Sequence, residues 1–310
     1  MQWIDDLSVK KCVDRKAAFE AMKAVFQAMD ADHAQSFPVV REAIGHADAL
    51  FGFKSGFDRD SMTLGVKAGG YWPNNHQRNL ANHQSTILLF NPDTGQCEAV
   101  VAGNEITALR TAAAAAVSIH ALAPAKSKVL GIIGAGHQSA YQLEAALDTL
   151  PFEQVLGWNH RSGRMRHLQA IAEQHNVPFV ETDLTHLGAE SDCIITITSS
   201  FSPVLLDSHV VGPTHIAAMG TDTVGKQELE ASLVARANCF AELPVQSAQL
   251  GECQNAVKQG DLAVGDIQCI GGVLAGRLSG RHGGEVTLFD GSGVGLQDLA
   301  LAQVALEKAP

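Results

Sequence analysis

The sequence predicts an α/β protein: a parallel-sheet domain with helices on both faces, joined to a second, α+β domain. From residue 128 onward, short apolar runs alternate with amphipathic segments, which is the pattern of parallel βαβ units. Before residue 103, short β-like runs are broken by Gly, Pro and Asn, as in an antiparallel sheet. Residues 285–309 form a strand, a glycine turn and a helix, and we expect that helix to pack on the N-terminal domain.

Composition sets the first limits on function. The 310 residues are enough for two domains or one large one. Hydrophobic residues make up 46% and charged residues 18%, as in an ordinary globular protein. The net charge of −11 argues against nucleic acid as a partner. We see no signal peptide and no apolar stretch of transmembrane length, so we expect a cytoplasmic protein without membrane contact.

Cysteine and histidine spacing predicts neither disulfides nor a metal. The six cysteines lie at positions 12, 97, 193, 239, 253 and 269, without CxxC or CxH pairs. We therefore expect reduced, mostly buried thiols. The 13 histidines show neither HExxH nor HxH spacing.

The N-terminal part begins with a helix at residues 14–30, where apolar residues recur at helical spacing after the capping residue Asp14. β-like runs follow over residues 37–102, and "NPDTG" (91–95) between two of them predicts a hairpin turn. Residues 104–123 predict a closely packed helix rich in alanine, which Pro124 helps to end.

The later part predicts the alternating elements of the parallel sheet. Strands are expected at 128–133, 154–158, 178–180, 193–197, 215–219 and 238–241. Helices are expected at 138–149, 162–175, 226–236 and 246–257.

A glycine loop follows the first of these strands. In "GAGHQS", Gly134 and Gly136 have GxG spacing, and Ser139 stands where a third glycine often occurs. Between a strand and a helix, such a loop lets a pyrophosphate approach the helix N-terminus, so it predicts a Rossmann dinucleotide site. The alternative is a turn that only packs helix on strand.

The end of the next strand bears on the choice of cofactor. An NAD site usually places Asp or Glu there, whereas this chain has Asn159, followed by His160, Arg161, Arg164 and Arg166. Arginines suit a 2′-phosphate, so we expect NADPH, with NADH also accepted. Alternatively, the arginines belong to a solvated helix N-terminus, although cations there oppose the helix dipole.

Several stretches together carry a family resemblance. They are "LGVKAGGYWP", "NHQSTILLFNPDTG", "ITALRTAAAAA", "IIGAGHQ", "AAMGTDTVGKQEL" and "LFDGSGVGLQDLA". In this order they resemble the ornithine cyclodeaminase/mu-crystallin family over nearly the whole chain. Its members include cyclodeaminases, an alanine dehydrogenase, ketimine or Δ1-pyrroline-2-carboxylate reductases, and mu-crystallin, which binds NADPH and thyroid hormone.

The resemblance implies a discontinuous arrangement of two domains. Residues 1–118 and 294–310 would form a substrate-binding and dimerisation domain, and residues 119–293 a Rossmann NAD(P)-binding domain. The family is usually dimeric, with the N-terminal sheets paired across the two-fold axis, so the resemblance implies a homodimer.

The resemblance also implies the site residues. The substrate carboxylate would be bound by Arg41, Lys67 and Arg110, and Asp222 in "MGTD" would be the acid/base, with Lys67 also catalytic. The turn Gly291–Val294 would approach the nicotinamide end of the cofactor. The implied cofactor-binding positions are His83, Gln84, Ser85, Arg110, Gly134, Gly136, His137, Gln138, Asn159, His160, Arg161, Arg164, Thr198, Met219 and Gly291.

These residue types also suit imine reduction on chemical grounds. A planar α-imino acid needs its carboxylate held so that C2 faces the nicotinamide, which an arginine and a lysine do well. The imine nitrogen must be protonated, so a nearby acid is needed. Each residue also has a purely structural interpretation: Asp222 as a turn or helix cap, Lys67 as a surface lysine, and Arg110 as an ion-pair partner.

We therefore predict reduction of a cyclic α-imino acid, Δ1-pyrroline-2-carboxylate to L-proline, with Δ1-piperideine-2-carboxylate also accepted. The alternatives are an ornithine cyclodeaminase, an alanine dehydrogenase and a mu-crystallin-like binding protein. A cyclodeaminase typically uses NAD⁺ and needs an acid for the distal amine. At the end of the strand that would carry an acid for NAD⁺, this chain has Asn159. At the position expected for the acid that binds the distal amine, it has Phe51 and Phe53, although Glu42 and Asp48 are close in sequence.

Overall fold

The computed structural model describes residues 1–309, which form two compact units. Unit 1 contains Met1–Arg110 and the residues from Val294 onward, and unit 2 contains Thr111–Gly293. The chain passes from unit 1 to unit 2 inside α3 (Gly103–Leu122). The assignment of substrate and cofactor to separate domains stays a prediction.

Unit 1 is built on a mixed sheet that is mostly antiparallel, as the sequence predicts. Its strand order is β1-β7-β6-β5-β4-β2, with β3 also paired to β4, and only the β1–β7 pair is parallel among these strands. The predicted "NPDTG" turn joins β6 to β7, and Asn91 Oδ1 accepts hydrogen bonds from the backbone of Asp93 and Thr94. The strands are β1 (Gln2–Ile4), β2 (Ala34–Ser36), β3 (Val40–Ala43), β4 (Leu50–Asp58), β5 (Thr63–Tyr71), β6 (His83–Phe90) and β7 (Cys97–Ala102).

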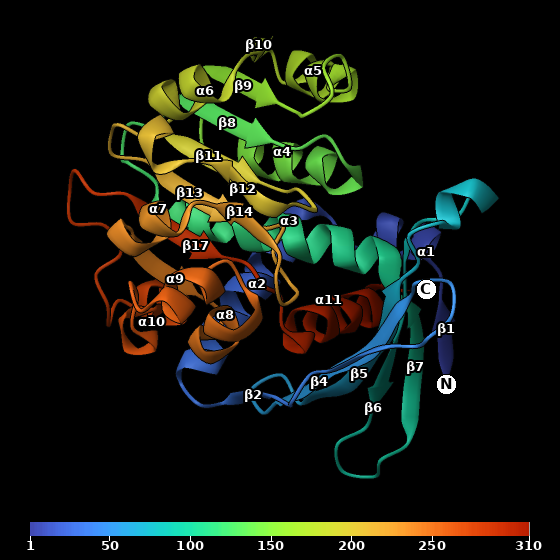
Figure 1. Cartoon of the computed structure of the whole chain (residues 1–310). Coiled ribbons are helices and arrows are strands. Elements are labelled where there is room, and N and C mark those ends of the chain that lie inside the picture. The colour runs from blue at the N-terminus through green and yellow to red at the C-terminus, as the bar shows by residue number, and fades with distance from the viewer. Residues whose placement is uncertain (310) are drawn as a thin grey trace. The chain divides into compact units, whose positions relative to one another are not determined.

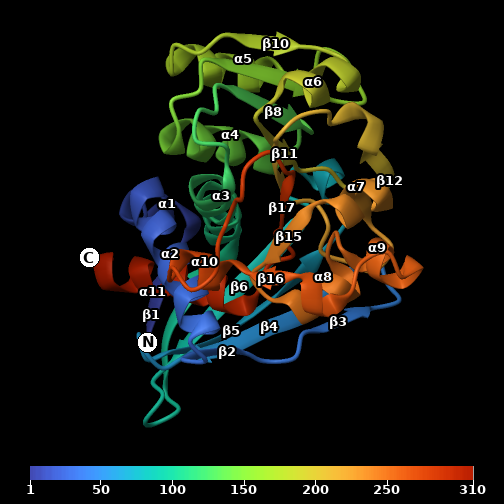
Figure 2. The ribbon, with the colours of Figure 1, turned by 90° about the vertical axis from the view of Figure 1, so that its left-hand side faces the viewer.

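Helices cover one face of this sheet. Figures 1 and 2 show α11 (Gly295–Lys308) lying across β4, β5 and β6, with α1 (Asp6–Cys12) and α2 (Arg15–Asp30) beside it. The expected packing of the final helix on the N-terminal part is therefore present. Close packing needs a glycine: a Cβ at Gly65 would lie 2.8 Å from Leu299 Cδ2. The predicted cap of α2 is also present, because Asp14 accepts a hydrogen bond from the backbone of Ala17.

Unit 2 contains an eight-stranded sheet in the order β10-β9-β8-β11-β13-β17-β15-β16, and every pair in it is parallel. The order reverses between β8 and β11, which makes this the switch point where ligands bind in such sheets. The strands are β8 (Val129–Ile133), β9 (Gln154–Trp158), β10 (Phe179–Glu181), β11 (Cys193–Thr196), β13 (His215–Ala218), β15 (Asn238–Ala241), β16 (Gln268–Cys269) and β17 (Thr287–Asp290).

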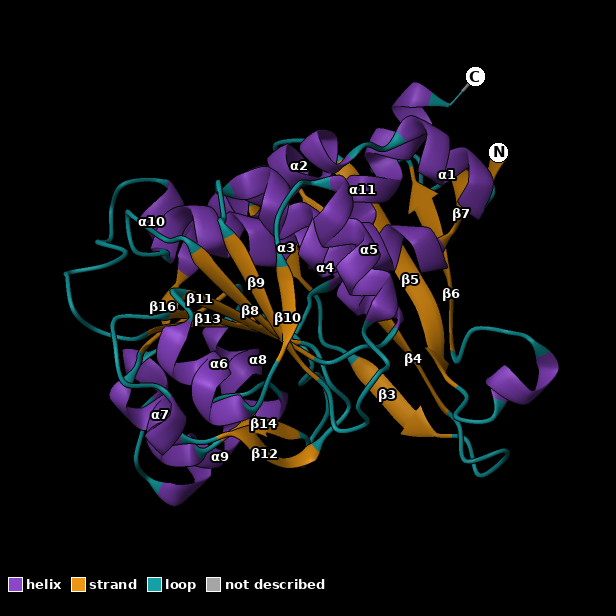
Figure 3. Cartoon of the chain, turned by 90° about the horizontal axis from the view of Figure 1, so that it is seen from above, coloured by secondary structure: helices purple, strands orange, loops and turns teal. Residues whose placement is uncertain are grey.

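Helices lie on both faces of the parallel sheet, which confirms the predicted α/β class. Figure 3 shows α4 and α5 on one side and α6 and α7 on the other. A separate parallel pair is formed by β12 (Phe201–Leu205) and β14 (Gln227–Leu229). The helices are α4 (His137–Thr149), α5 (Arg166–Gln174), α6 (Leu184–Glu190), α7 (Ala231–Arg236), α8 (Pro244–Leu250), α9 (Gln254–Gln259) and α10 (Ile270–Leu274).

Three predicted helices need correction. The helix expected at 162–175 begins at Arg166, because Gly163 is in the left-handed region with φ +73°. The helix expected at 226–236 begins only at Ala231, after β14, whose backbone N–H groups at 228 and 229 donate to the buried Glu252 carboxylate. The helix expected at 246–257 is interrupted at Gly251 and forms α8 and α9.

The core of unit 2 is a cluster of buried aliphatic side chains from the central strands, including Ile133, Ile194, Ile216 and Leu288. Within residues 1–309, no helix is both long and apolar enough to cross a membrane. The same residues contain no group of three or more His, Cys, Asp or Glu side chains that could hold a metal ion.

Candidate active site

Unit 1 carries a row of cations on the side of its sheet that α11 covers. Lys54 and Lys67 are directly opposite each other in the β4–β5 pair, so their side chains leave the same face. Arg41 pairs with Gly52, two residues from Lys54, and therefore also leaves that face. We call Arg41, Lys54 and Lys67, together with Arg110 from α3, the cation face.

Lys67 is buried and held by two oxygen atoms. Its Nζ donates to Asp298 Oδ1 at 2.8 Å and to Thr107 Oγ1 at 2.7 Å. The residue is only 6% exposed. A surface lysine, one of the two interpretations open from the sequence, is therefore wrong for Lys67, and a buried ammonium must have such partners.

Arg110 is held by the same helix that provides Asp298. Its NH1 donates to Gln297 Oε1 at 3.0 Å, and its Nε lies 3.4 Å from Asp298 Oδ1. Gln297 Oε1 also accepts from the Val294 backbone at the start of α11. The N-terminal turn of α11 thus fixes both the lysine and the arginine.

Asp298 is completely buried among these cations. Burial by itself would raise the pKa of its carboxyl group, but Lys67 and Arg110, with a further contribution from Lys54, lower that pKa to about 2. Asp298 is therefore ionised at neutral pH. Its Oδ2 has no hydrogen-bond partner within residues 1–309.

The "HQST" segment lies on β6, next to Lys67. His83 and Ser85 pair with Tyr71 and Gly69, so they share the face of Lys67, whereas Gln84 points to the opposite face. Burial, followed by the charge of Lys67, lowers the pKa of His83 to about 4, so this histidine is neutral at pH 7. The structure therefore places two of the three predicted residues beside the cation face.

In unit 2, Gly134 and Gly136 form the predicted loop between β8 and α4. Gly134 has φ +116°, and a Cβ there would lie 2.5 Å from the Ile197 carbonyl oxygen. A Cβ at Gly136 would meet nothing within 4 Å, and Gly136 caps α4 without a side-chain hydrogen bond. The start of α4 therefore has open space beside Gly136 and no side-chain cap, as a phosphate site requires.

The other predicted cofactor residues of unit 2 surround this loop and the neighbouring strand ends. His137 and Gln138 begin α4, and His137 stacks edge-on against Tyr141. Thr198 follows β11, and its Cγ2 would lie 3.3 Å from a Cβ at Gly134. Met219 and Gly291 follow β13 and β17, and the Met219 side chain lies over Gly291.

The arginines expected to bind the 2′-phosphate of NADPH lie in the loop from β9 to α5. Asn159 is partly buried, whereas His160, Arg161 and Arg164 are exposed. Asn159 Nδ2 donates to the Arg161 carbonyl oxygen at 2.9 Å. Arg161 and Arg164 precede α5, whereas Arg166 is its first residue, so the alternative interpretation as a helix N-terminus holds for Arg166 only. A carboxylate is also present, because Glu181 Oε1 accepts from the Gly163 backbone.

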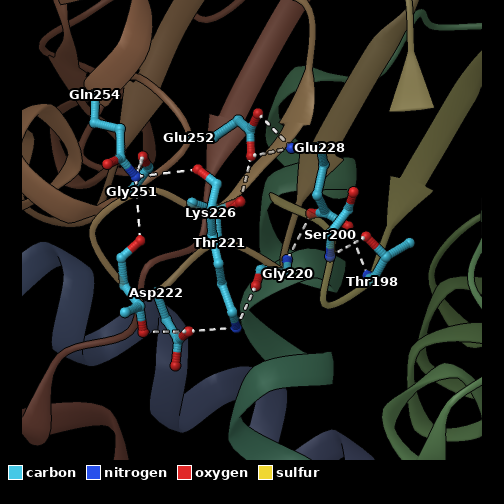
Figure 4. Close-up of polar contacts among 11 residues, drawn as sticks. Thr198, Ser200, Gly220, Thr221, Asp222, Lys226, Glu228, Gly251, Glu252 and Gln254 are labelled. Carbon is cyan, nitrogen blue, oxygen red and sulfur yellow. Dashed lines mark hydrogen bonds and ion pairs between the residues drawn. The ribbon is translucent and has the colours of Figure 1, made fainter. Parts of the chain in front are cut away.

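Asp222 lies in the loop between β13 and β14, drawn in Figure 4. Its Oδ1 accepts from Lys226 Nζ at 2.8 Å, and Lys226 also donates to the Gly220 carbonyl oxygen at 3.2 Å. The Asp222 side chain is 38% exposed. No helix follows directly, so the suggested role as a cap for a helix at 226 is wrong.

Two buried glutamates hold this loop in place. Glu228 accepts hydrogen bonds from Gly220 N, Thr198 N and Thr196 Oγ1. Glu252 accepts from Thr221 Oγ1 and from the backbone of β14. Burial raises the pKa of Glu228, and burial together with the charge of Glu228 raises the pKa of Glu252 well above its usual range.

The residues that sequence reasoning missed are Lys54, Asp298, Lys226, Glu228 and Glu252. Lys54 could have been predicted from the alternation of side chains along β4. Phe51 and Phe53 point to one face of the strand, so Lys54 points to the other. The two glutamates could not, since Glu228 accepts from Thr198 N, 30 residues away, and Glu252 accepts from Thr221 Oγ1, 31 residues away.

Comparison with known proteins places the chain in a family. The model of the ornithine cyclodeaminase/mu-crystallin family matches residues 5–310. The chain belongs to this family. The resemblance drawn from the sequence motifs is thus confirmed.

Within the family, the chain is similar to an iminosuccinate reductase of Paracoccus denitrificans, with 58% identity over 294 residues that cover 95% of this chain and 92% of the relative. The crystal structure of that reductase with NAD⁺ aligns with a TM-score of 0.96 at 55% identity, covering 99% of this chain and 95% of the other.

More distant structures align over the whole length as well. The Δ1-pyrroline-2-carboxylate reductase of Thermococcus litoralis, in complex with NADH and L-proline, has a TM-score of 0.94 at 25% identity and covers 100% of this chain and 97% of its own. An archaeal alanine dehydrogenase dimer with bound NAD has a TM-score of 0.94 at 28% identity, with coverages of 99% and 95%.

Proposed function

We propose that this protein reduces the C=N bond of an imino acid with a reduced nicotinamide cofactor, and that the substrate is iminosuccinate, which gives L-aspartate. Similarity to an iminosuccinate reductase over 95% of the chain supports the substrate. The observation that carries the proposal is the charge of the cation face, because a substrate with two carboxylates needs more cations than one with a single carboxylate.

The charges on this face can be compared with those of the substrate. Lys54, Lys67 and Arg110 all act on the Asp298 carboxylate. With Arg41, the cation face has four positive charges against the one negative charge of Asp298, an excess of three, which suits a substrate with two carboxylates better than one with a single carboxylate. The whole chain has a net charge of −11, so this local excess is not a general property of the protein.

Lys67 and Arg110 are the proposed ligands of the α-carboxylate. Both are rigidly held by α11, and preorganised charged donors bind a carboxylate without a large entropic cost. A carboxylate fixed by two donors also fixes the plane of the adjoining imine. Lys67 and Arg110 are thus proposed to bind the substrate and to orient its imine.

The glycine loop of unit 2 suits a dinucleotide. The open space over Gly136 and the uncapped start of α4 fit a pyrophosphate. When bound, the reduced nicotinamide supplies the hydride for C2 of the imine. Relatives bind NAD⁺ or NADH, and we propose that both NADH and NADPH serve here, with the arginines at 161 and 164 favouring NADPH.

Asp222 is the proposed acid for the imine nitrogen. As C2 is reduced, the π electron pair of the C=N bond moves to nitrogen, which must carry or take up a proton. Lys226, 2.8 Å from the Asp222 carboxylate, holds that side chain in one orientation.

The first experiment follows oxidation of NADH and of NADPH by the purified protein. The substrates are oxaloacetate with ammonium, which form iminosuccinate in solution, pyruvate with ammonium, and Δ1-pyrroline-2-carboxylate. We expect the highest kcat/KM with the first mixture, and chromatography should identify L-aspartate as product. Faster turnover of the cyclic imine, the substrate predicted from the sequence, would reject iminosuccinate and favour L-proline formation.

A further inference from the structure

We infer that Lys54 binds the second, distal carboxylate of the substrate and so makes the site selective for dicarboxylic imino acids. This inference rests on the proposed function, because it assigns the part of the substrate that distinguishes iminosuccinate from other imino acids. Lys54 would be a specificity-determining residue, whereas Lys67 and Arg110 hold the carboxylate common to all of them.

The first support is position. Lys54 lies directly opposite Lys67 on the face that α11 covers. Cβ atoms of directly opposite residues in an antiparallel pair are about 4.5–5.5 Å apart. The two carboxylates of a four-carbon acid are joined by two carbons, so two neighbouring ammonium groups can each bind one of them.

The second support is the electrostatic environment. The helix α11 begins beside Lys54, since a Cβ at Gly295 would lie 3.2 Å from Lys54 Cβ. The positive end of the α11 dipole therefore adds to the charge of the lysine. Asp298, which contacts Lys67, also attracts Lys54. The ammonium group of Lys54 is therefore drawn toward Lys67 and Arg110.

The test compares substrates that differ in the distal carboxylate. Wild type, Lys54→Gln and Lys54→Arg are assayed in the oxidative direction with NAD⁺ and either L-aspartate or L-alanine. Lys54→Gln should lower kcat/KM for L-aspartate about 10- to 100-fold, the effect of losing one charged hydrogen bond, and leave L-alanine within about 3-fold. Lys54→Arg should retain most of the preference. Lys10→Gln, an exposed lysine of α1, is the matched control and should change neither substrate.

Thermal unfolding shows whether the variant is folded. Since Lys54→Gln removes one of several charges that stabilise the Asp298 carboxylate, the variant should unfold cooperatively with a Tm only slightly below that of wild type. Equal losses with both amino acids, or no loss with either, would overturn the inference.

A binding measurement separates this inference from the proposed function. The dianion succinate and the monoanion propanoate are titrated against the protein saturated with NAD⁺. We expect wild type to bind succinate more tightly, and Lys54→Gln to bind the two with similar affinity. If wild type failed to oxidise L-aspartate yet showed this preference, the proposed reaction would fail and the role of Lys54 would stand. Equal affinity of wild type for the two anions would overturn the role of Lys54, whatever substrate the enzyme reduces.

Discussion

Asp298 connects the two cations that are proposed to bind the α-carboxylate. Replacing it by asparagine would leave Lys67 and Arg110 buried without their counter-charge. We expect Asp298→Asn to lower the free energy of unfolding at neutral pH by about 3–5 kcal/mol, as when one partner of a buried ion pair is removed. Urea denaturation measures this, with the exposed Asp261→Asn as control. Similar stability of the two variants would contradict this account of Asp298.

The same residue predicts a pH dependence. The pKa of Asp298 is about 2 in the folded protein and 3.8 without these contacts, so its ionised form stabilises the fold. This contribution, about 2 kcal/mol, is complete above about pH 4 and is lost as the pH falls toward 2. Between these pH values, the free energy of unfolding should change less steeply with pH for Asp298→Asn than for wild type. Identical slopes would exclude Asp298 as the titrating group.

Asp222 and Lys226 are expected to affect turnover to different degrees. Asp222→Asn should lower kcat by about 10²-fold, because the imine nitrogen loses its proton source. Lys226→Gln should have a smaller effect of several-fold, since a partly exposed ion pair contributes only about 0–1 kcal/mol. Steady-state kinetics with iminosuccinate measures both. Near-normal turnover of Asp222→Asn would remove this residue from the mechanism.

At the scale of an element, the loop between β9 and α5 tests the cofactor prediction. The double variant Arg161→Ala/Arg164→Ala should raise KM for NADPH far more than KM for NADH, because only NADPH carries the 2′-phosphate. Arg78→Ala, at an exposed position of unit 1, is the matched control. An equal rise for both cofactors would mean that these arginines do not contact that phosphate.

Elements with a strong periodic pattern were predictable from the sequence. The helix α2 after Asp14, the strands of the parallel sheet and the hairpin turn at 91–95 agree with it, since each depends on residues close in the chain. The strand β14 was not predictable. Its backbone is bound by Glu252, more than twenty residues later, and a contact of this kind outweighs local helix propensity.

Among the site residues, too, some could be predicted from nearby sequence, whereas others depend on contacts between distant segments. Gly134, Gly136 and Asp222 follow strands of a parallel sheet, so their positions at strand ends could be inferred. Asp298 could not, because it meets Lys67 only when the last helix packs on the N-terminal sheet. The roles of all these residues stay predictions.

At the scale of the whole molecule, the face of the unit 1 sheet opposite α11 carries a group of apolar side chains, with the polar Ser55, Gln84 and Thr86 on the same face. It contains Phe53, Val66, Leu88, Val100 and Trp3, which follow from the strand pairing. Trp3 is 62% exposed and Phe53 is 44% exposed. Apolar faces of this kind usually bind a partner, so we expect a homodimer through this face.

A charge in the middle of that face should prevent the dimer. Leu88→Glu would place a carboxylate among apolar side chains, and burying an unpaired charge is costly. Light scattering during size-exclusion chromatography should give the mass of a dimer for wild type and of a monomer for the variant. Ser61→Glu, in an exposed turn, should leave the mass unchanged. A monomeric wild type would refute the expected homodimer.

The order of the units along the chain has a consequence for biosynthesis. Unit 2 is one continuous segment, Thr111–Gly293, whereas unit 1 needs α11, which follows that segment. On the ribosome, unit 2 is therefore complete before any residue of α11 has been made. Until Asp298 is added, Lys54 and Lys67 lie on an uncovered sheet. The nascent chain thus carries a complete unit 2 and an unfinished cationic sheet, and the last helix completes unit 1.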